Sequence, residues 1–378
     1  MVNHELSTLL PTLLPDEDAS LAVEVLKSFG VLTAIDVVFT PSIPPHPALP
    51  PTAFSRLRSL VSAHLGAPST SGAFLLGQHF DYKGKQPQRF STSLDELDQH
   101  LSGGFELGEV VEICGVPGSG RTALALYAIL LHLLLHSDKR AAWLDTGGTF
   151  DPFRCLAILR DVLIPRLLEL GGSFAGEDGQ EPGAEDLAIS VLDRLAVSRV
   201  TKSGDALDTL TSETRAEGKV ETLDMVVVDS LDVLLGGDAL TGSSAQGPAS
   251  LVTFLRRLSS LAQSTTLPLA ILVITTAAPT AQTSSSKRAA TSAPSNLPPQ
   301  PPPLSSLPLA TPLKPALGST YTYQLDVSLL ILPGEPLFGP RDGKDRFLVE
   351  VTRNPRGKTG QLVAFKLENG VKLEQVED

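Results

Sequence analysis

Eight consecutive residues form a pattern that can bind the phosphate groups of a nucleotide. They follow an apolar stretch at residues 110–114 and lead into an apolar helix. The eight residues are Gly115, Val116, Pro117, Gly118, Ser119, Gly120, Arg121 and Thr122. Glycines let successive backbone N–H groups turn toward phosphate oxygens, and the helix N-terminus adds a partial positive charge. The Thr122 hydroxyl can reach a Mg²⁺ ion. We therefore predict a phosphate-binding loop, in preference to a glycine-rich turn without a ligand.

A carboxylate that fits the same chemistry follows about a hundred positions later. The apolar run at residues 225–228 is consistent with a buried strand, and it ends in Asp229. An acid at the end of such a strand holds the Mg²⁺ ion of many nucleotide-binding proteins. Many buried strands also end in Asp as a helix cap. Because the phosphate pattern is present in the same chain, we predict that Thr122 and Asp229 bind Mg²⁺ together.

Alternating strands and helices are expected to position these residues. Apolar patterns predict strands at residues 108–114, 141–145, 188–195, 225–229 and 269–275. Helical patterns lie between them, at residues 122–136, 153–170, 204–217 and 249–263. This alternation predicts an α/β fold with a mostly parallel central sheet covered on both faces. Three later β-type runs, at residues 326–332, 346–352 and 361–367, suggest an antiparallel C-terminal extension.

Composition divides the rest of the chain. Residues 1–66 carry helical patterns interrupted by Gly30 and a Pro-rich spacer, which predicts a small all-helical domain. Residues 67–89 have the composition of a linker, and residues 90–378 form the core. An acid-rich insertion at residues 171–186 is expected to be a surface loop. The Pro- and Ser-rich segment at about residues 278–316 is expected to be a mobile or disordered insertion.

The charge and cysteine content exclude some classes of protein. The net charge of −12 over 378 residues argues against wrapping long stretches of duplex DNA. The two cysteines, Cys114 and Cys155, are too few for a disulfide framework and lack the spacing of a zinc site. We expect both thiols to lie in or near the core. No apolar run of 18 residues and no secretory signal pattern is found, so an intracellular protein is expected.

Motifs along residues 90–367 together resemble one family. They are residues 91–98, 101–105, the strand at 108–110 that leads into the loop, 144–150, 315–318, and Arg353 with Gly360. These segments resemble the core of the RecA-type recombinase superfamily. The helical domain in front resembles that of the eukaryotic recombinase paralogues, the D-type paralogue most of all. The resemblance implies a RecA-like core that binds ATP and Mg²⁺ and acts in the nucleus, in homologous recombination and DNA double-strand-break repair.

Three positions depart from the family pattern. Arg121 replaces the phosphate-loop lysine, and a planar guanidinium does not reproduce a compact ammonium. Gly147 stands where the family has the glutamate that activates the attacking water. Such a group contributes about 10²–10⁴ in rate, roughly 3–5 kcal/mol of barrier. Thr276 and Ala277 replace the family's Asn-Gln pair, which senses the γ-phosphate. These departures predict nucleotide binding with little hydrolysis and leave no confident catalytic residue.

The two loops that would face DNA are poor in basic and aromatic residues. The first, at residues 236–248, contains Asp238 and no basic residue, whereas the second contains Lys287, Arg288 and Lys314. Stacking of bases on aromatic side chains is therefore not supported. Residues 341–358 hold six basic residues against three acids. The candidate DNA contacts are Lys287, Arg288, Arg353, Arg356 and Lys358, while Arg256 and Arg257 are expected on an exposed helix face.

Three functions remain open. The first is an ATP-binding accessory protein that joins other recombinase-family subunits and binds single-stranded or branched DNA weakly alone. The second is an active DNA-dependent ATPase that exchanges strands, which needs Asp145 or Asp151 to replace the missing carboxylate. The third is an interaction scaffold that binds no nucleotide.

Overall fold

The computed structural model describes residues 5–65, 88–174, 182–214, 222–241, 246–264, 268–279, 305–307, 313–317, 321, 324–335, 338–339 and 345–376. The chain divides into two compact units, residues 1–86 and residues 87–378. The predicted boundaries at residues 66 and 90 fall on either side of this division. Of the predicted linker, only Gln88 and Arg89 are described, and Arg89 opens a strand.

The first unit is helical. Its helices are α1 (Leu6–Leu13), α2 (Asp16–Ser28), α3 (Ala34–Phe39) and α4 (Pro51–Leu65). They bury an apolar cluster that includes Leu10, Leu26 and Val61. The Thr33 side chain accepts from the Asp36 backbone N–H and the Asp36 side chain accepts from that of Thr33, so a capping box starts α3. Helix α1 was not predicted.

The second unit is built on a ten-stranded mixed sheet, and its strand order is β12-β11-β10-β9-β3-β7-β6-β4-β5, with β8 paired to β7. Strands β3, β4, β5, β6, β7 and β9 run parallel to their neighbours within this set, and β8, β10, β11 and β12 run antiparallel. The bounds are β3 Val110–Gly115, β4 Lys139–Asp145, β5 Leu195–Arg199, β6 Thr222–Asp229, β7 Ala270–Pro279, β8 Leu313–Pro315, β9 Val327–Pro333, β10 Arg346–Arg353, β11 Gln361–Glu368 and β12 Lys372–Gln375. A separate antiparallel pair joins β1 (Arg89–Phe90) to β2 (Phe105–Glu106). The predicted α/β class with an antiparallel extension is confirmed.

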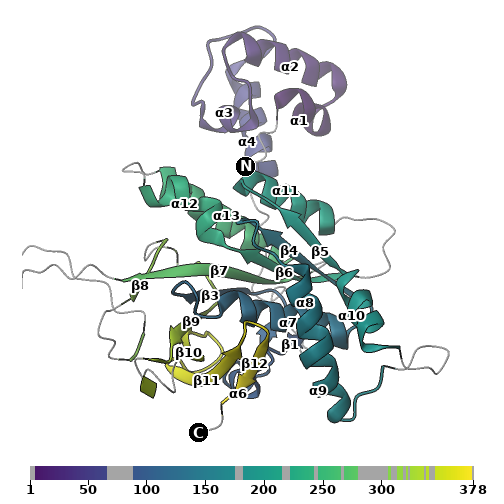
Figure 1. Ribbon diagram of the computed structural model, residues 1–378. Helices are drawn as coiled ribbons and strands as arrows, with labels where there is room; N and C mark the ends of the chain where they lie inside the picture. The colour runs from purple at the N-terminus through teal and green to yellow at the C-terminus, as the bar shows by residue number, and fades with distance from the viewer. Residues whose placement is uncertain are drawn as a thin grey trace, which may run out of the picture. The chain divides into compact units, whose positions relative to one another are not determined.

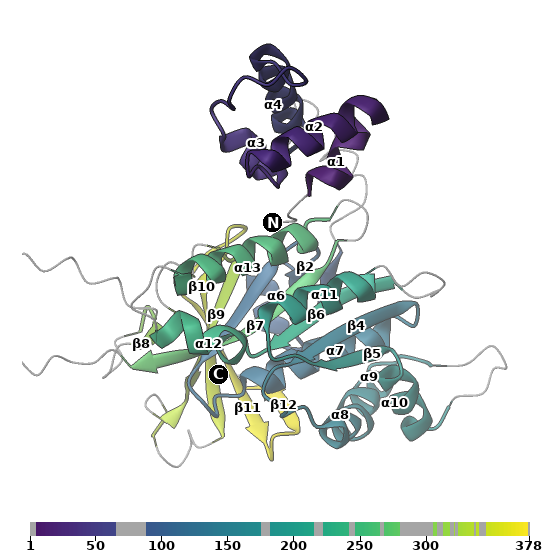
Figure 2. The same cartoon turned by 90° about the horizontal axis from the view of Figure 1, so that it is seen from above.

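Helices cover both faces of this sheet (Figures 1 and 2). On one face lie α7 (Arg121–Leu135), α8 (Pro152–Ile158), the π turn η1 (Leu159–Leu163), α9 (Ile164–Glu169) and α10 (Ala184–Leu192). On the other lie α11 (Ser203–Thr214), α12 (Leu231–Thr241) and α13 (Gln246–Ala262). A short helix, α6 (Asp95–His100), joins β1 to β2.

The alternation of side chains along the central strands explains the two layers. In β4, Trp143 packs into the α7 side of the core, and its neighbour Leu144 packs into the α13 side. Val227 and Val228 divide in the same way in β6. Successive side chains of a strand point to opposite faces, so a strand buried on both faces is apolar throughout. Both cysteines are buried and free, as expected.

Three predicted elements are wrong in part. Residues 188–195 were predicted as a strand, but Ala184–Leu192 is helix α10 and the strand begins at Leu195. Ala188 and Val191 recur at helical spacing and are buried against the α7 side of the core, which favours the helix. The predicted loop at residues 171–186 therefore ends before α10, and its residues 175–181 lie outside the described part. Strand β9 was expected in the antiparallel extension, but it is parallel to β3.

The two loops expected to face DNA also differ from prediction where they are described. Helix α12 extends to Thr241 and α13 begins at Gln246, so most of residues 236–248 is helical. Strand β7 runs on to Pro279, and Leu313–Pro315 returns as β8 beside it. The Ser305 hydroxyl donates a 2.5 Å hydrogen bond to Glu350. Residues 280–304 and 308–312 of the 278–316 insertion lie outside the described residues.

Candidate nucleotide-binding site

The phosphate-loop pattern occupies the predicted place between a buried strand and a helix. Strand β3 ends at Gly115 and α7 begins at Arg121. Gly118 and Gly120 have φ angles of +80° and +87°, which residues other than glycine rarely adopt. A Cβ on Gly115 would stand 2.5 Å from Ser119 Oγ and 2.7 Å from the Ile331 carbonyl. The glycines therefore permit a tight loop, and at Gly115 no side chain would fit between the loop backbone and strand β9.

The two predicted Mg²⁺ ligands are in direct contact. Thr122 Oγ1 donates a 3.0 Å hydrogen bond to Asp229 Oδ2. Burial raises the pKa of Asp229, while the Thr122 hydroxyl and the Arg121 charge lower it. A hydroxyl and a carboxylate are oxygen ligands of the kind that Mg²⁺ takes beside a bound phosphate. The strand order places Asp229 one strand beyond β7, at the same carboxyl edge as the loop.

Ser119 supplies an independent sign that the loop suits a phosphate. Its side-chain oxygen is buried and has no hydrogen-bond partner within the part of the chain that the structure describes. An unpaired buried hydroxyl is costly unless a ligand or water satisfies it. The loop N–H groups, this hydroxyl and the Thr122–Asp229 pair therefore fit Mg²⁺-ATP, where ATP would bring the phosphates and Mg²⁺ would neutralise their charge.

The position of the missing glutamate has space but no carboxylate. Gly147 follows β4, and a Cβ there would meet only the Thr149 side chain, at 3.6 Å. Asp145 accepts hydrogen bonds of 2.7 and 3.1 Å from the backbone N–H groups of Gly148 and Thr149. Asp151 caps helix α8 by accepting from the Phe153 N–H at 2.9 Å. Asp145 and Asp151, the two possible replacements for the missing glutamate, thus both accept hydrogen bonds from nearby backbone N–H groups.

Arg121 contacts the residue at the sensor position. Its Nη1 donates to the Thr275 carbonyl at 2.5 Å and to Thr276 Oγ1 at 3.0 Å. Thr276 Oγ1 in turn donates to Asp232 Oδ2 at 2.6 Å. Sequence reasoning did not identify Asp232, which lies in the first turn of α12. The sequence signal that could have identified Asp232 is its position three residues after the predicted Mg²⁺ ligand Asp229.

Glu112 is a second residue that the sequence analysis missed. It is fully buried in β3 and accepts from Thr275 Oγ1 at 2.6 Å and from Ser328 Oγ at 2.5 Å. Burial raises its pKa, and the two hydroxyls lower it. The sequence signal that could have identified Glu112 is its position as a single acid within an apolar strand. It ties β3 to β7 and β9 beneath the loop.

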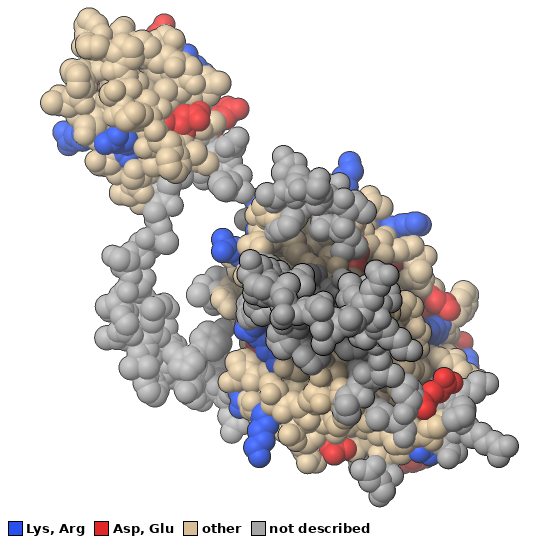
Figure 3. Space-filling model, turned by 90° about the vertical axis from the view of Figure 1, so that its left-hand side faces the viewer, with Lys and Arg blue, Asp and Glu red and all other residues tan. Residues whose placement is uncertain are grey.

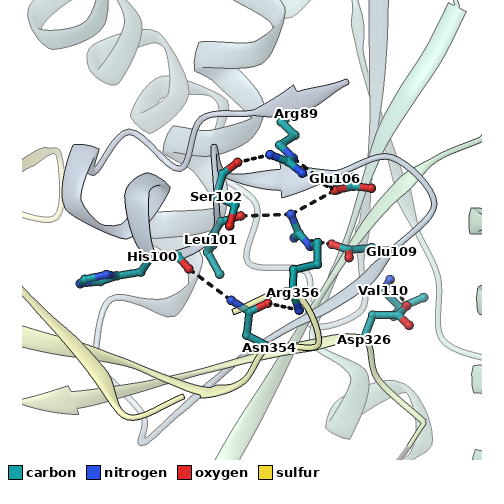
Figure 4. Close-up of polar contacts among 10 residues, drawn as sticks. All are labelled: Arg89, His100, Leu101, Ser102, Glu106, Glu109, Val110, Asp326, Asn354 and Arg356. Carbon is teal, nitrogen blue, oxygen red and sulfur yellow. Dashed lines mark hydrogen bonds and ion pairs between the residues drawn. The ribbon is translucent and has the colours of Figure 1, made fainter. Parts of the chain in front are cut away.

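The structure describes three of the five candidate DNA contacts, Arg353, Arg356 and Lys358. Arg356 lies in ion pairs with Glu106 at 3.1 Å and Glu109 at 2.7 Å, and it also donates to the Leu101 carbonyl (Figure 4). It therefore joins the turn after β10 to the segment between α6 and β3, and two carboxylates offset its charge. Lys358 is exposed, Arg353 is partly buried, and Lys287 and Arg288 lie outside the described residues.

Other basic side chains are dispersed. Arg256 and Arg257 are exposed on α13, as expected. On the face drawn in Figure 3, the Lys and Arg side chains stand singly or in small groups with Asp and Glu among them. The described residues contain no cluster of three or more His, Cys, Asp or Glu arranged for a metal ion. Among the described helices, none has both the length and the apolar character to cross a membrane.

Comparisons of the sequence find similarity to proteins named for DNA repair and recombination. The chain is 27% identical over 258 residues to the "DNA repair protein RAD51 homolog 4" of Bos taurus, which covers 66% of this chain and 71% of that protein. It is 42% identical over 64 residues to the "DNA repair and recombination protein RadB" of Thermococcus kodakarensis, covering 17% of this chain and 27% of that protein. No protein-family model matches the chain.

A shorter sequence match and a solved structure are also similar to the chain. The "DNA repair and recombination protein RadA" of Methanococcus maripaludis is 29% identical over 148 residues, covering 34% of this chain and 44% of that protein. A solved structure titled "Crystal structure of the RadB recombinase" matches with a TM-score of 0.48 and 21% identity, over 76% of this chain and all of that one. These sequence relatives are named for DNA repair and recombination, and the chain resembles the recombinase paralogues of the RecA-type recombinase superfamily.

Proposed function

We propose that this protein is an ATP-binding accessory factor of homologous recombination and double-strand-break repair. It acts in the nucleus together with other recombinase-family subunits, and it hydrolyses ATP slowly or not at all. The observation that carries the proposal is the contrast within one site. The Thr122–Asp229 pair is in place at 3.0 Å, whereas position 147 carries no side chain.

The binding half of the proposal rests on the phosphate loop. The loop offers backbone N–H groups at a helix N-terminus, the Ser119 hydroxyl, which has no partner among the described residues, and a hydroxyl–carboxylate pair for Mg²⁺. Arg121 keeps a positive charge beside them. These groups support ATP and Mg²⁺ as ligands, in which case Mg²⁺ offsets the charge of Asp229 and of the phosphates.

The slow-hydrolysis half rests on the groups around Gly147. Attack of water on a γ-phosphate is accelerated by a residue that orients the water. Asp145 is bonded to the turn that follows β4, and Asp151 caps α8. Freeing either carboxylate would break backbone hydrogen bonds. These contacts argue against the alternative of an active strand-exchange ATPase.

The sequence relatives and the basic residues support the proposed partners and the proposed weak DNA binding. Proteins named for DNA repair and recombination match this chain, which supports other recombinase-family subunits as partners. The dispersed basic residues and the use of Arg356 within the fold support weak binding of single-stranded or branched DNA by the protein alone.

Equilibrium binding tests the proposal. Purified protein is dialysed against labelled ATP with and without Mg²⁺, and each recombinase-family subunit of the same organism is then added and the mass of the assembly measured. We expect Mg²⁺-dependent binding and a hetero-oligomer with at least one subunit. An absence of nucleotide binding would favour the nucleotide-free scaffold, and an absence of any hetero-oligomer would contradict the accessory role.

A further inference from the structure

The Arg121 guanidinium is already bonded within the protein. Its Nη1 donates to the Thr275 carbonyl and to the Thr276 hydroxyl, at 2.5 and 3.0 Å. The pairing of β3 with β7 sets Thr276 opposite Gly115, at the point where the phosphate loop leaves its strand. The Arg121 Cδ atom would lie 3.4 Å from a Cβ on Gly115. The side chain thus runs beside the start of the loop toward the end of β7.

Thr276 is itself fixed from the other side. Its backbone N–H donates to Asp232 Oδ1 at 3.0 Å, and its hydroxyl donates to Asp232 Oδ2 at 2.6 Å. With its proton committed to Asp232, the hydroxyl oxygen can only accept from Arg121. The three side chains therefore form a directed chain from Arg121 to Thr276 to Asp232.

The surrounding charges strengthen this arrangement. The Arg121 charge acts on Asp229, and the Thr276 hydroxyl joins Arg121 to Asp232. Arg121 is thus a cation among acids. Moving the guanidinium to a phosphate leaves the Thr275 carbonyl and the Thr276 hydroxyl without this donor, which costs free energy.

We propose that Thr276, held by Asp232, restrains Arg121 as an autoinhibitory contact, so that the phosphates of a nucleotide compete with Thr275 and Thr276 for the guanidinium. The proposal rests on the proposed function, because it concerns the same loop and ligand. Thr276 is here a positioning residue that lowers the affinity for nucleotide. A residue that aided nucleotide binding would have the opposite effect when removed.

The first test measures nucleotide affinity. Thr276→Val keeps the shape of the side chain and removes the hydroxyl, while Thr276→Ser keeps the hydroxyl. Loss of one hydrogen bond that competes with the ligand should tighten Mg²⁺-ATP binding by about threefold to tenfold in Thr276→Val. Thr276→Ser should match the wild type, as should the control Thr209→Val on α11, whose hydroxyl donates to the Asp205 carbonyl within its own helix. Unchanged or weaker binding by Thr276→Val would overturn the proposal.

The second test needs no nucleotide. Melting temperatures are measured for Arg121→Ala, Thr276→Val and the double variant in nucleotide-free protein. If the two side chains are bonded, the double variant should lose less than the sum of the two single shifts. Additive shifts would overturn the contact.

The outcomes separate this proposal from the proposed function. Wild-type binding without tightening in Thr276→Val contradicts the autoinhibitory contact alone. Binding by neither protein contradicts ATP binding and, with it, the competition. Binding by Thr276→Val but not by the wild type supports the contact and contradicts ATP binding by the natural protein.

Discussion

The hydroxyl of Thr122 and the carboxylate of Asp229 meet at 3.0 Å, although 107 positions separate them in the chain. One belongs to the first turn of α7 and the other ends β6. Strand β7 lies between β3 and β6, so the sheet brings the helix and the strand end to one edge. This pair is the part of the site that most resembles a working Mg²⁺-nucleotide centre, and the first prediction concerns it.

Thr122→Val should weaken Mg²⁺-ATP binding by about tenfold or more, because it removes the hydroxyl proposed to bind Mg²⁺, which also bonds Asp229. Binding without Mg²⁺ should change little. Calorimetry with and without Mg²⁺ measures both, and Thr209→Val is the matched control. Equal weakening in the presence and absence of Mg²⁺ would argue against a metal role for Thr122.

Gly147→Glu should restore part of the hydrolysis. A Cβ at this position meets only the Thr149 side chain at 3.6 Å, so the substitution does not strain the backbone. A positioned base contributes about 10²–10⁴ in rate, and an unoptimised one should give the lower end of that range. Phosphate release is compared with that of Gly147→Gln, which has the same size without the carboxylate. Equal rates for the two variants would mean that the missing carboxylate does not limit turnover.

Glu109 should make stability depend on pH. Burial raises its pKa from 4.5 to about 7, with Arg356 opposing and Glu106 and Asp326 adding to the rise. The folded protein therefore binds this proton more tightly than the unfolded chain. The protonation of Glu109 therefore adds to the free energy of unfolding in full below pH 4.5, and this addition is lost as the pH rises through about 7.

Glu109→Gln should remove this part of the pH dependence. Melting temperatures measured from pH 4.5 to 8 should fall less steeply for Glu109→Gln than for the wild type. The exposed residue Glu169 supplies the control, Glu169→Gln. Parallel curves for the wild type and Glu109→Gln would show that Glu109 does not titrate in this range.

Arg356→Ala should destabilise the core by about 3 kcal/mol. The change leaves Glu106 and Glu109 without their ion pair to this side chain, and breaking such a pair when it is largely buried costs about this much. The exposed Lys358→Ala should change the unfolding free energy by less than about 0.5 kcal/mol. Denaturant unfolding of the two variants measures the difference. A neutral Arg356→Ala would return this residue to the candidate DNA contacts.

The loop, Asp229 and the α/β class could be predicted from the sequence because each depends on a short local pattern. Glycine spacing fixes the loop, and an apolar strand ending in an acid identifies Asp229. The strand predicted at residues 188–195 failed because a short apolar run fits a helix as well as a strand, and packing beside α7 decided between them.

The contacts of Arg121, Asp232 and Arg356 could not be predicted in the same way. Each depends on which strands are neighbours. Arg121 meets Thr276 because β3 pairs with β7, and Arg356 meets Glu109 because the turn after β10 lies beside α6 and β2. No local pattern contains that information. Arg356 therefore looked like a member of a basic stretch until its partners were known.

The central claim is that the site holds ATP without hydrolysing it, and a single-turnover experiment tests this directly. The protein, in excess over γ-labelled ATP and with Mg²⁺, is sampled over time with and without single-stranded DNA, and bound ATP and released phosphate are measured in the same aliquots. We predict that ATP binds and leaves intact in both conditions. Release of phosphate from bound ATP faster than ATP dissociates, with or without DNA, would contradict the claim.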